Sequence, residues 1–169
     1  MGQAVLTLLE DSRQQKGKHK NIELYCKQAG IRLVRTKLLV GDYMLAGGAE
    51  NGLGTSGIKG DITCDSKMGL PEVASNCFQE HERFRAECQL AKDLGIKLII
   101  LIEEVPPGGE VRNWVSPLDR YGKAKYKFNP ETLQKVMETM TDRYDVQFRF
   151  CDGRSTGKHL IEYLKGERK

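Results

Sequence analysis

The sequence lacks the features that would place the chain in a membrane. Its longest purely apolar run, residues 98–102, is far shorter than the roughly 20 residues needed to span a bilayer. The N-terminal MGQAVLTLLED has no basic segment ahead of its apolar residues, which argues against a secretory signal peptide. Position 6 is leucine, where myristoylation would need serine or threonine. We therefore expect no membrane segment and no membrane partner.

The sequence also lacks cysteine pairs. Its five cysteines include no CxxC spacing, and their odd number leaves at least one without an intramolecular partner. This pattern favours a reducing, cytoplasmic compartment, in which the thiols act as small core residues.

Internal repeats, heptads and extremes of charge are absent as well. The 169 residues are 30% charged and 39% hydrophobic, which excludes a disordered acidic chain and agrees with one globular domain. We expect a single domain over residues 1–169, with a core at about 4–104 and a C-terminal strand-helix extension at about 110–169. The net charge of +4 permits a polyanionic partner without requiring one.

Apolar patterns alternate between strand and helix along the chain. The segment at 96–102 is apolar on both faces, which is typical of a strand in the middle of a covered parallel sheet. The glycine-rich segment at 46–57 is typical of a long hairpin loop. Together these patterns predict an α/β fold. The expected strands are 4–9, 31–39, 40–45, 58–67, 96–102 and 146–151, and the expected helices are 20–29, 71–94 (interrupted near 75–76), 130–144 and 155–165.

Three residues in the strand segments stand out chemically: Asp42, Asp65 and Lys67. Asp42 follows the apolar run 38–40, where burial of a carboxylate is costly unless a cation meets it. In a strand over 40–45, its side chain shares the face of the apolar residues before it. Asp65 and Lys67 are two residues apart, so we expect them to project side by side from one face of their strand.

Two acids and a lysine on adjacent strands can hold a divalent cation with an ammonium group beside it. Mg²⁺ takes one or two carboxylates and completes its coordination with water and phosphate oxygens. Such an ion lowers the pKa of a bound water, and a lysine with a lowered pKa can orient or deprotonate that water. The plainer alternatives are a solvated Asp–Lys pair on an edge strand and a simple Gly-Asp turn.

Five short motifs follow one another in a specific order. They are Asp11-Ser-Arg13-Gln14, Leu39-Val-Gly-Asp-Tyr43, Asp65-Ser-Lys67, Glu72-Val73 and His81-Glu-Arg-Phe-Arg85. This series resembles the nuclease domain of the XPF-type structure-specific endonucleases, in the PD-(D/E)xK superfamily, and most resembles their compact, stand-alone bacterial and phage forms. The resemblance covers roughly residues 5–104. It implies a restriction-endonuclease-like core, in which helices flank a central mixed β-sheet.

The resemblance also implies a site. Mg²⁺ or Mn²⁺ would be held by Asp42, Asp65 and the backbone carbonyl of Ser66, with Asp11 as a further catalytic and metal-binding acid. Lys67 would position the attacking water, and cleavage of branched or forked DNA would leave 5′-phosphate and 3′-hydroxyl ends. Nuclease domains of this family often dimerise, so a homodimer is a further expectation.

Three positions depart from the family pattern. Asp65 stands where the family has glutamate, which keeps the charge on a shorter side chain. Ser66 replaces an arginine, and Gln14 replaces a glutamate that could act as a ligand or support one. Because Lys67 and the acids are kept, we expect an active endodeoxyribonuclease. The alternative is a catalytically inactive module of the same fold that binds DNA or a protein partner.

Basic residues near these motifs are candidates for contacts with nucleic acid. Arg83 matches the family's arginine and could bind phosphate, or could instead pair with Glu87 on the same helix. The segment 120–128 interleaves basic and aromatic residues, which suits a phosphate backbone and unpaired bases, although a solvated loop is the plainer alternative. The candidates for contacts with DNA are Arg13, Lys18, Arg83, Lys123 and Lys125.

Two glycine-rich segments, 52–57 and 153–157, come close to the phosphate-binding loop of nucleotide-binding enzymes. The first lacks the Gly-Lys-Ser/Thr ending. The second has three rather than four residues between its glycines, and His159 stands in place of serine or threonine. A helix N-cap at Ser155 or Thr156 explains this segment more simply, so a nucleotide-binding enzyme is the weakest hypothesis.

Overall fold

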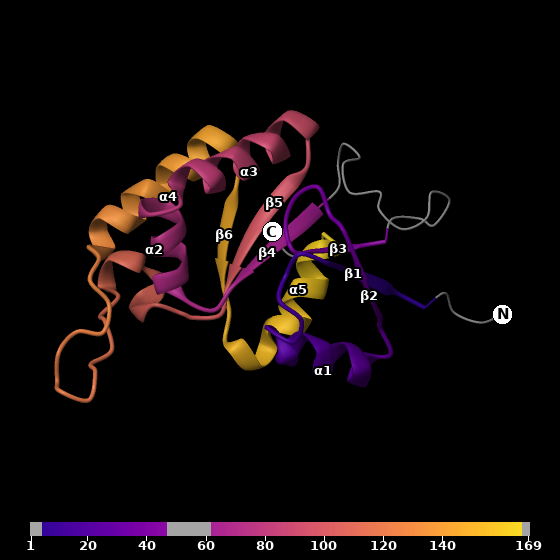
Figure 1. Cartoon of the computed structure of the whole chain (residues 1–169), viewed down its shortest axis with the longest axis horizontal. Helices are drawn as coiled ribbons and strands as arrows, with labels where there is room; N and C mark the ends of the chain where they lie inside the picture. The colour runs from indigo at the N-terminus through magenta and orange to yellow at the C-terminus, as the bar shows by residue number, and fades with distance from the viewer. Residues whose placement is uncertain (1–4, 47–61, 167–169) are drawn as a thin grey trace.

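The computed structural model describes residues 5–46 and 62–166, which form one β-sheet with helices on both faces (Figure 1). Its strands are β1 (Thr7–Asp11), β2 (Arg32–Thr36), β3 (Tyr43–Leu45), β4 (Ile62–Lys67), β5 (Lys97–Ile102) and β6 (Gln147–Phe150). Within the described ranges their order is β2-β1-β3-β4-β5-β6. The pairs β1–β2, β4–β5 and β5–β6 are parallel, whereas β1–β3 and β3–β4 are antiparallel. The predicted α/β fold with a central mixed sheet is confirmed.

Two groups of helices cover the two faces of this sheet (Figure 1). The helices are α1 (Lys20–Ala29), α2 (Leu70–Phe78), α3 (His81–Leu94), α4 (Pro130–Tyr144) and α5 (Thr156–Leu164), with short 3-10 turns η1 (Pro107–Gly109), η2 (Val111–Asn113) and η3 (Gly153–Ser155). One core joins α2, α3 and α4 to the sheet through residues such as Phe84 and Ile100. The other joins α1 and α5 through residues such as Ile22 and Ile99. Neighbouring residues of β5 therefore enter opposite cores, which explains why this strand is apolar on both faces.

Most helix ends follow their sequence signals. Gly30 and Gly95 end α1 and α3 in the left-handed conformation, which glycine adopts without steric cost. The Asn129 side chain caps α4 by accepting a hydrogen bond from the backbone N–H three residues later. At α5, Ser155 holds the N-cap position, but its hydroxyl donates to the Asp152 carbonyl instead of capping the helix.

The helix expected over 71–94 breaks later than its sequence suggests. Ser75 and Asn76 stay within α2, where their side chains bond to residues four positions on rather than to the backbone. The break falls instead at Gln79 and Glu80, between α2 and α3.

The segment between β2 and β3 is not the extended strand that its apolar residues suggest. Residues 37–42 lie outside both strands, and Gly41 has a left-handed φ of 75°. This turn reorients the chain, so the strand alternation expected to align Asp42 with Val40 does not apply. Instead, the Asp42 N–H donates to the Cys64 carbonyl (2.8 Å), which seats the turn on β4.

We expect Gly41→Ala to destabilise the protein by about 3 kcal/mol. A Cβ at this position would lie 2.2 Å from Thr63 Oγ1 and 3.1 Å from the Cys64 carbonyl oxygen, on a backbone already in the left-handed region. Chemical denaturation measures the loss. Gly30→Ala is the control, because it shares the left-handed φ but has nothing within 4 Å, and should cost only about 1 kcal/mol. Equal losses in both variants would contradict a steric role for Gly41.

The remaining expectations concern thiols, membranes and the glycine-rich loop. All five cysteines are buried and free, as predicted for small core residues. No helix in the described ranges is long and apolar enough to cross a bilayer. The hairpin loop expected at 46–57 lies almost wholly outside the described residues, as do the first residues of the strand expected at 58–67 and the glycine-rich segment at 52–57.

Candidate active site

A cleft of about 670 Å³ opens where the ends of β1 and β4 and the turn at 39–42 meet helices α2 and α3. Residues from four separate parts of the sequence meet in it. Of the residues predicted from sequence, those lining the cleft are Asp11, Arg13, Lys18, Asp42, Asp65, Lys67 and Arg83.

Strand β4 presents Asp65 and Lys67 to this cleft. The two side chains lie on one face of the strand, with Lys67 Nζ 3.0 Å from Asp65 Oδ2. The Lys67 side chain is only 12% exposed, and the Asp65 side chain only 5%. The structure therefore has the expected side-by-side arrangement, and this ion pair is largely shielded from water rather than solvated.

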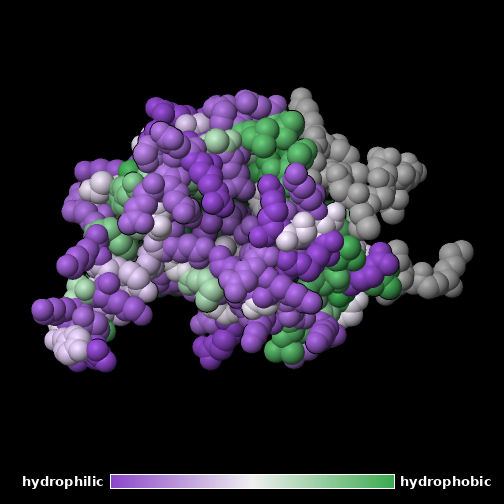
Figure 2. Space-filling model, viewed as in Figure 1, coloured by the Kyte–Doolittle hydropathy of each residue, from purple (hydrophilic) through white to green (hydrophobic). Residues whose placement is uncertain are grey.

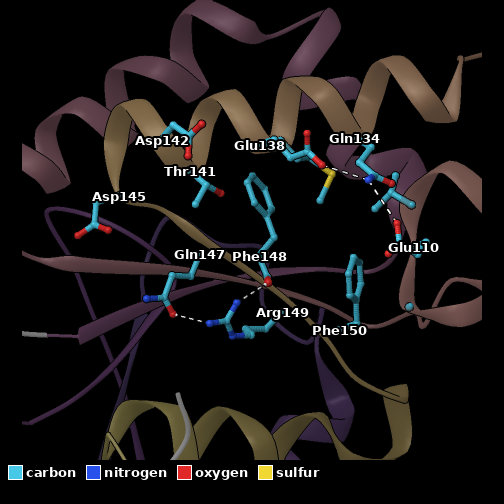
Figure 3. Close-up of a pocket in the computed structure, with 13 residues that line it drawn as sticks. Glu110, Gln134, Glu138, Thr141, Asp142, Asp145, Gln147, Phe148, Arg149 and Phe150 are labelled. Carbon is cyan, nitrogen blue, oxygen red and sulfur yellow. Dashed lines mark hydrogen bonds between the residues drawn. The ribbon is translucent and has the colours of Figure 1, made fainter.

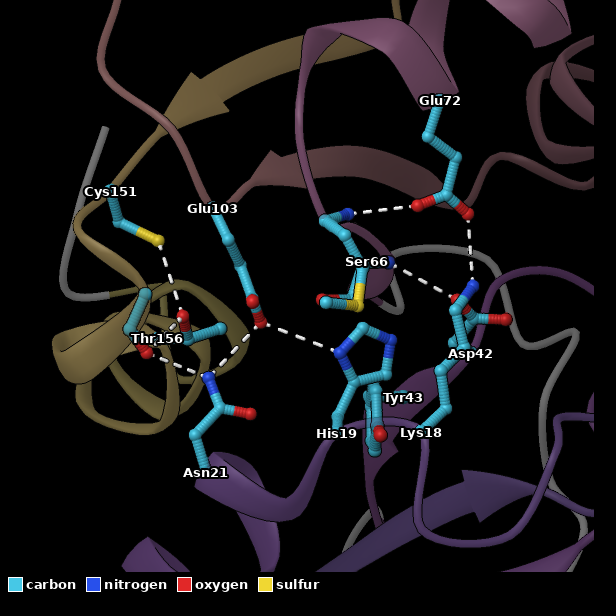
Figure 4. Close-up of polar contacts among 12 residues, drawn as sticks. Lys18, His19, Asn21, Asp42, Tyr43, Ser66, Glu72, Glu103, Cys151 and Thr156 are labelled. Atoms are coloured by element: carbon cyan, nitrogen blue, oxygen red, sulfur yellow. Dashed lines mark hydrogen bonds and ion pairs between the residues drawn. The ribbon is translucent and has the colours of Figure 1, made fainter. Parts of the chain in front are cut away.

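Asp42 is held against the ends of β1 and β4. Its Oδ2 accepts a hydrogen bond from the Ser66 N–H (3.1 Å), as Figure 4 shows. Its carbonyl accepts from the Asp11 N–H at the end of β1 (2.7 Å). The Asp42 carboxyl also lies within hydrogen-bonding reach of Asp65. Two acids distant in sequence thus share one side of the cleft.

These neighbouring carboxyls shift the protonation of the site. Burial, and then the charge of Asp65, raise the pKa of Asp42 well above its ordinary value. Burial disfavours the charged form of Lys67, but the charges of Asp65 and Asp42 outweigh it and raise the pKa of Lys67. Without a metal ion, the pKa of Lys67 is therefore raised rather than lowered. Lys67 is a cation suited to orienting a water or a phosphate.

Glu87 on α3 is a site residue that sequence reasoning missed, since it considered this side chain only as a partner for Arg83. It lines the cleft, and its Oε1 accepts a hydrogen bond from the Gly41 N–H (3.0 Å). Burial, and then the charge of Asp65, raise the pKa of Glu87. A signal was present, because Glu87 directly precedes the buried Cys88 and so lies beside the core stripe of its helix.

Asp11 and Arg13 brace the chain that leads into the Asp42 turn. The Asp11 carboxylate accepts hydrogen bonds from Arg13 Nε (2.9 Å) and from the Leu38 N–H (3.0 Å). Arg13 Nη2 in turn donates to the Leu38 carbonyl (2.6 Å). Asp11 thus has a structural role in the segment before Asp42, besides lining the cleft.

The opposite wall of the cleft is tied together by Lys18 and Glu72. Lys18 Nζ lies 2.9 Å from Glu72 Oε1, and Glu72 Oε2 accepts from the Met68 N–H (2.8 Å) (Figure 4). Nearby, Gln14 lines the cleft with both polar atoms of its amide buried and without a hydrogen-bond partner among the described residues. The amide of Gln14, which stands where the resembled family has glutamate, can therefore form a hydrogen bond with a ligand in the cleft.

A divalent cation fits the donors of this cleft. Asp42, Asp65 and Glu87 bring three carboxyls near one lysine, and burial, followed by the charge of Asp65, raises the pKa values of Asp42 and Glu87. In the part of the chain that the structure describes, no three acidic, histidine or cysteine side chains form a metal-binding cluster. Mg²⁺ needs no such cluster, because it takes one or two carboxylates and otherwise keeps its waters.

Lys123 and Lys125 lie outside the cleft. They belong to a projecting segment between η2 and α4, residues 115–127, which we call the basic hairpin because Leu118 and Ala124 form an isolated antiparallel bridge in it. Both lysine side chains are exposed. The sequence motif located these cations correctly on a loop, but only the structure shows that they are separate from the acids.

A separate cavity of about 640 Å³ lies between α4 and the edge strand β6 (Figure 3). Glu138 and Asp142 line it without any lysine, and its Arg149 donates to Gln147 and to the Phe148 carbonyl. None of the residues predicted from sequence lines this cavity. The pairing of buried acids with a lysine therefore belongs to the first cleft.

The fold of this chain is similar to that of solved XPF structures. The chain matches XPF from Aeropyrum pernix with a TM-score of 0.60 at 14% sequence identity, over 95% of this chain and 64% of that chain. XPF from Aeropyrum pernix in complex with DNA matches with a TM-score of 0.59 at 13% identity, over 95% and 64% of the two chains. No family model and no curated protein matches the sequence. The chain thus has an XPF-like nuclease fold and spans somewhat less than two thirds of the XPF chains it matches.

Proposed function

We propose that this protein is a metal-dependent endonuclease that hydrolyses phosphodiester bonds in DNA, with a preference for branched or forked DNA. The observation that carries the proposal is the buried arrangement of Asp42, Asp65 and Lys67 in one cleft. A protein that only binds DNA would have no use for two facing carboxyls and a shielded lysine, because burying such charges is costly.

The donor atoms suggest how Mg²⁺ or Mn²⁺ would be held. Asp42 and Asp65 supply carboxylate oxygens. The N–H and C=O of one residue in an extended strand point to the same edge. Because the Ser66 N–H points to Asp42, the Ser66 carbonyl is directed to the same side and can complete the set. The bound ion would supply Lewis-acid stabilisation of the phosphate and a water of lowered pKa.

Residues of the chain would supply the remaining steps. Lys67, held by Asp65, donates hydrogen bonds that orient the attacking water or a phosphate oxygen. Asp11 keeps the turn that carries Asp42 in position and lines the cleft, where it would serve as a further metal-binding acid. Arg83, exposed at the cleft, is suited to bind a neighbouring phosphate in forked geometry.

Duplex contacts would extend from this cleft over the exposed cations. Arg13 and Lys18 line it, although Arg13 is also paired with Asp11 and Lys18 with Glu72. The likeness to a solved XPF–DNA complex supports DNA as the partner, through the fold alone. We keep three further predictions: one domain over residues 1–169, a cytoplasmic location and a homodimer, for which the strand-helix unit at 146–165, with β6 at the end of the sheet formed by the described residues, offers a surface.

The decisive experiment is cleavage of labelled single-stranded, duplex, flap, fork and four-way DNAs in Mg²⁺, Mn²⁺ or EDTA. We expect metal-dependent cuts that Asp65→Asn reduces by a factor of order 10³, with 5′-phosphate ends. Asp93→Asn is the matched control, since Asp93 is an exposed aspartate on α3 outside the cleft. Binding of DNA without any cleavage would identify the inactive module. The absence of both binding and cleavage would refute a role on DNA.

A further inference from the structure

The basic hairpin, residues 115–127, stands apart from the body of the protein. In Figure 1 it is the orange loop that extends beyond α2 and α4, and the corresponding projection in Figure 2 is mostly hydrophilic. Its base is fixed by Trp114, whose ring stacks on Phe128 with centroids 4.7 Å apart. Trp114 is 6% exposed, so the hairpin grows out of a packed aromatic anchor rather than a loose loop.

This anchor is connected to the wall of the active-site cleft. Trp114 Nε1 donates to Glu104, and the other Glu104 oxygen accepts from the Leu70 N–H at the start of α2 (2.7 Å). The same helix carries Glu72 into the cleft. A cavity of about 350 Å³ lies between α2 and the base of the hairpin, and Glu72, Trp114 and Tyr126 are among the residues that line it. Glu72 lines both cavities, so the active-site cleft and the cavity beside the hairpin are neighbours that share this residue as a wall.

The tip of the hairpin has a defined conformation. The Asp119 N–H donates to the Lys123 carbonyl (2.7 Å), and the Lys125 N–H to the Pro117 carbonyl (2.8 Å). The Asp119 carboxylate accepts from the N–H groups of Tyr121 (2.8 Å) and Lys123 (3.0 Å). Gly122 takes the left-handed φ of 74° that this turn requires. Side chains at the tip are therefore displayed at little further cost in conformational entropy on binding.

The side chains displayed there are an aromatic ring and cations. Tyr121 is 70% exposed, and the Arg120 guanidinium lies 4.7 Å from its ring centroid. Arg120, Lys123 and the lysines at 125 and 127 are exposed, whereas the only acid between 115 and 127, Asp119, is occupied by backbone N–H groups. Exposed rings among cations match the surfaces that hold single-stranded nucleic acid, where bases stack and phosphates are neutralised.

We propose that the basic hairpin binds an unpaired DNA strand beside the duplex that enters the cleft, with Tyr121 stacking on a base and Arg120 and Lys123 holding its phosphates. This inference rests on the proposed function for its ligand. A base in a duplex has both faces covered by its neighbours, so a stacking contact selects unpaired DNA. A protein partner is the less favoured occupant, since cations outnumber acids and the exposed ring is coupled to a guanidinium.

The test uses the full chain with Asp42→Asn, which prevents cleavage, and forked DNAs carrying 2-aminopurine at successive positions of one unpaired arm. We expect quenching at one or two arm positions, lost in Tyr121→Ala and kept in Tyr121→Phe. Fork affinity should fall roughly tenfold in Tyr121→Ala, while affinity for a blunt duplex stays the same. The Tyr121 side chain is exposed, so an unchanged melting temperature should accompany the loss.

A charge control separates specific contacts from general attraction. Lys123→Ala should weaken fork binding more than Lys135→Ala, since Lys135 is also an exposed lysine but lies on α4. If the variant with Tyr121→Ala binds forks and quenches 2-aminopurine fluorescence as the Asp42→Asn protein does, the inference is overturned. In that case, metal-dependent cleavage by the wild-type protein would still support the proposed function. If no DNA is bound or cut by any variant, both fail together.

Discussion

Asp42→Asn is expected to abolish cleavage and, at the same time, to stabilise the protein in the absence of divalent metal. Asparagine keeps an oxygen that accepts from the Ser66 N–H and gains an N–H₂ that can donate to Asp65. It removes a charge whose burial and repulsion by Asp65 raise the pKa of the native carboxyl. We therefore expect a gain in stability of about 1 kcal/mol, the usual order of magnitude for a single substitution.

This gain depends on pH in a defined direction. A carboxyl with a raised pKa in the folded state costs nothing below its unfolded pKa, about 3.9 for aspartate, and costs progressively more as pH rises through the folded value. The melting temperatures of Asp42→Asn and wild type should therefore agree near pH 3.5 and separate by about 2–4 °C or more at neutral pH. Mg²⁺ should raise the melting temperature of wild type more than that of the variant. A variant that is less stable than wild type at neutral pH without metal would contradict the facing carboxyls.

Lys67→Met is expected to have the opposite effect on stability while also abolishing cleavage. Methionine fills the space of the aliphatic stem but leaves Asp65 without the ammonium 3.0 Å away. Removing one partner of a shielded ion pair leaves an uncompensated buried charge, so we expect a loss of about 3 kcal/mol without metal, part of which Mg²⁺ restores. Urea denaturation with and without Mg²⁺, beside the cleavage assay, measures both effects.

Two comparisons make this prediction specific. Lys18→Met is the matched control, because the Lys18–Glu72 pair is about 30% exposed on both sides and should be worth under about 1 kcal/mol. In the double variant Asp42→Asn with Lys67→Met, the loss should be smaller than in Lys67→Met alone, since less negative charge is left unbalanced. A loss in Lys67→Met no greater than in Lys18→Met would show that the pair is solvated after all.

Some of the site was readable from the sequence because it depends on local geometry. Asp65 and Lys67 are two residues apart on one strand, and strand alternation alone sets them on the same face. The charge of Asp42 after an apolar run points to this residue, but strand alternation does not set its orientation. The turn at Gly41, not strand alternation, brings its carboxyl to Ser66 and Asp65.

Other parts of the site depend on contacts between distant segments. Glu87 reaches the cleft because α3 packs against β5, and its bond to the Gly41 N–H joins two segments that are far apart in the chain. The protonation of Lys67 also depends on contacts between distant segments. Burial lowers the pKa of a lysine, but the two nearby carboxyls outweigh it here, and their distances come from folding.

The sequence by itself determined the α/β order of strands and helices, the ends of helices at Gly30, Gly95 and Asn129, and the motif order that resembles XPF-type nucleases. These features follow from steric preferences, capping and periodicity, which act over a few residues. The tertiary structure alone decided which acids meet, how far each is shielded from water, and that the basic hairpin is joined to the cleft through Glu104 and α2. Charge balance and burial depend on the packing of segments that the chain brings together from a distance, and no local pattern encodes them.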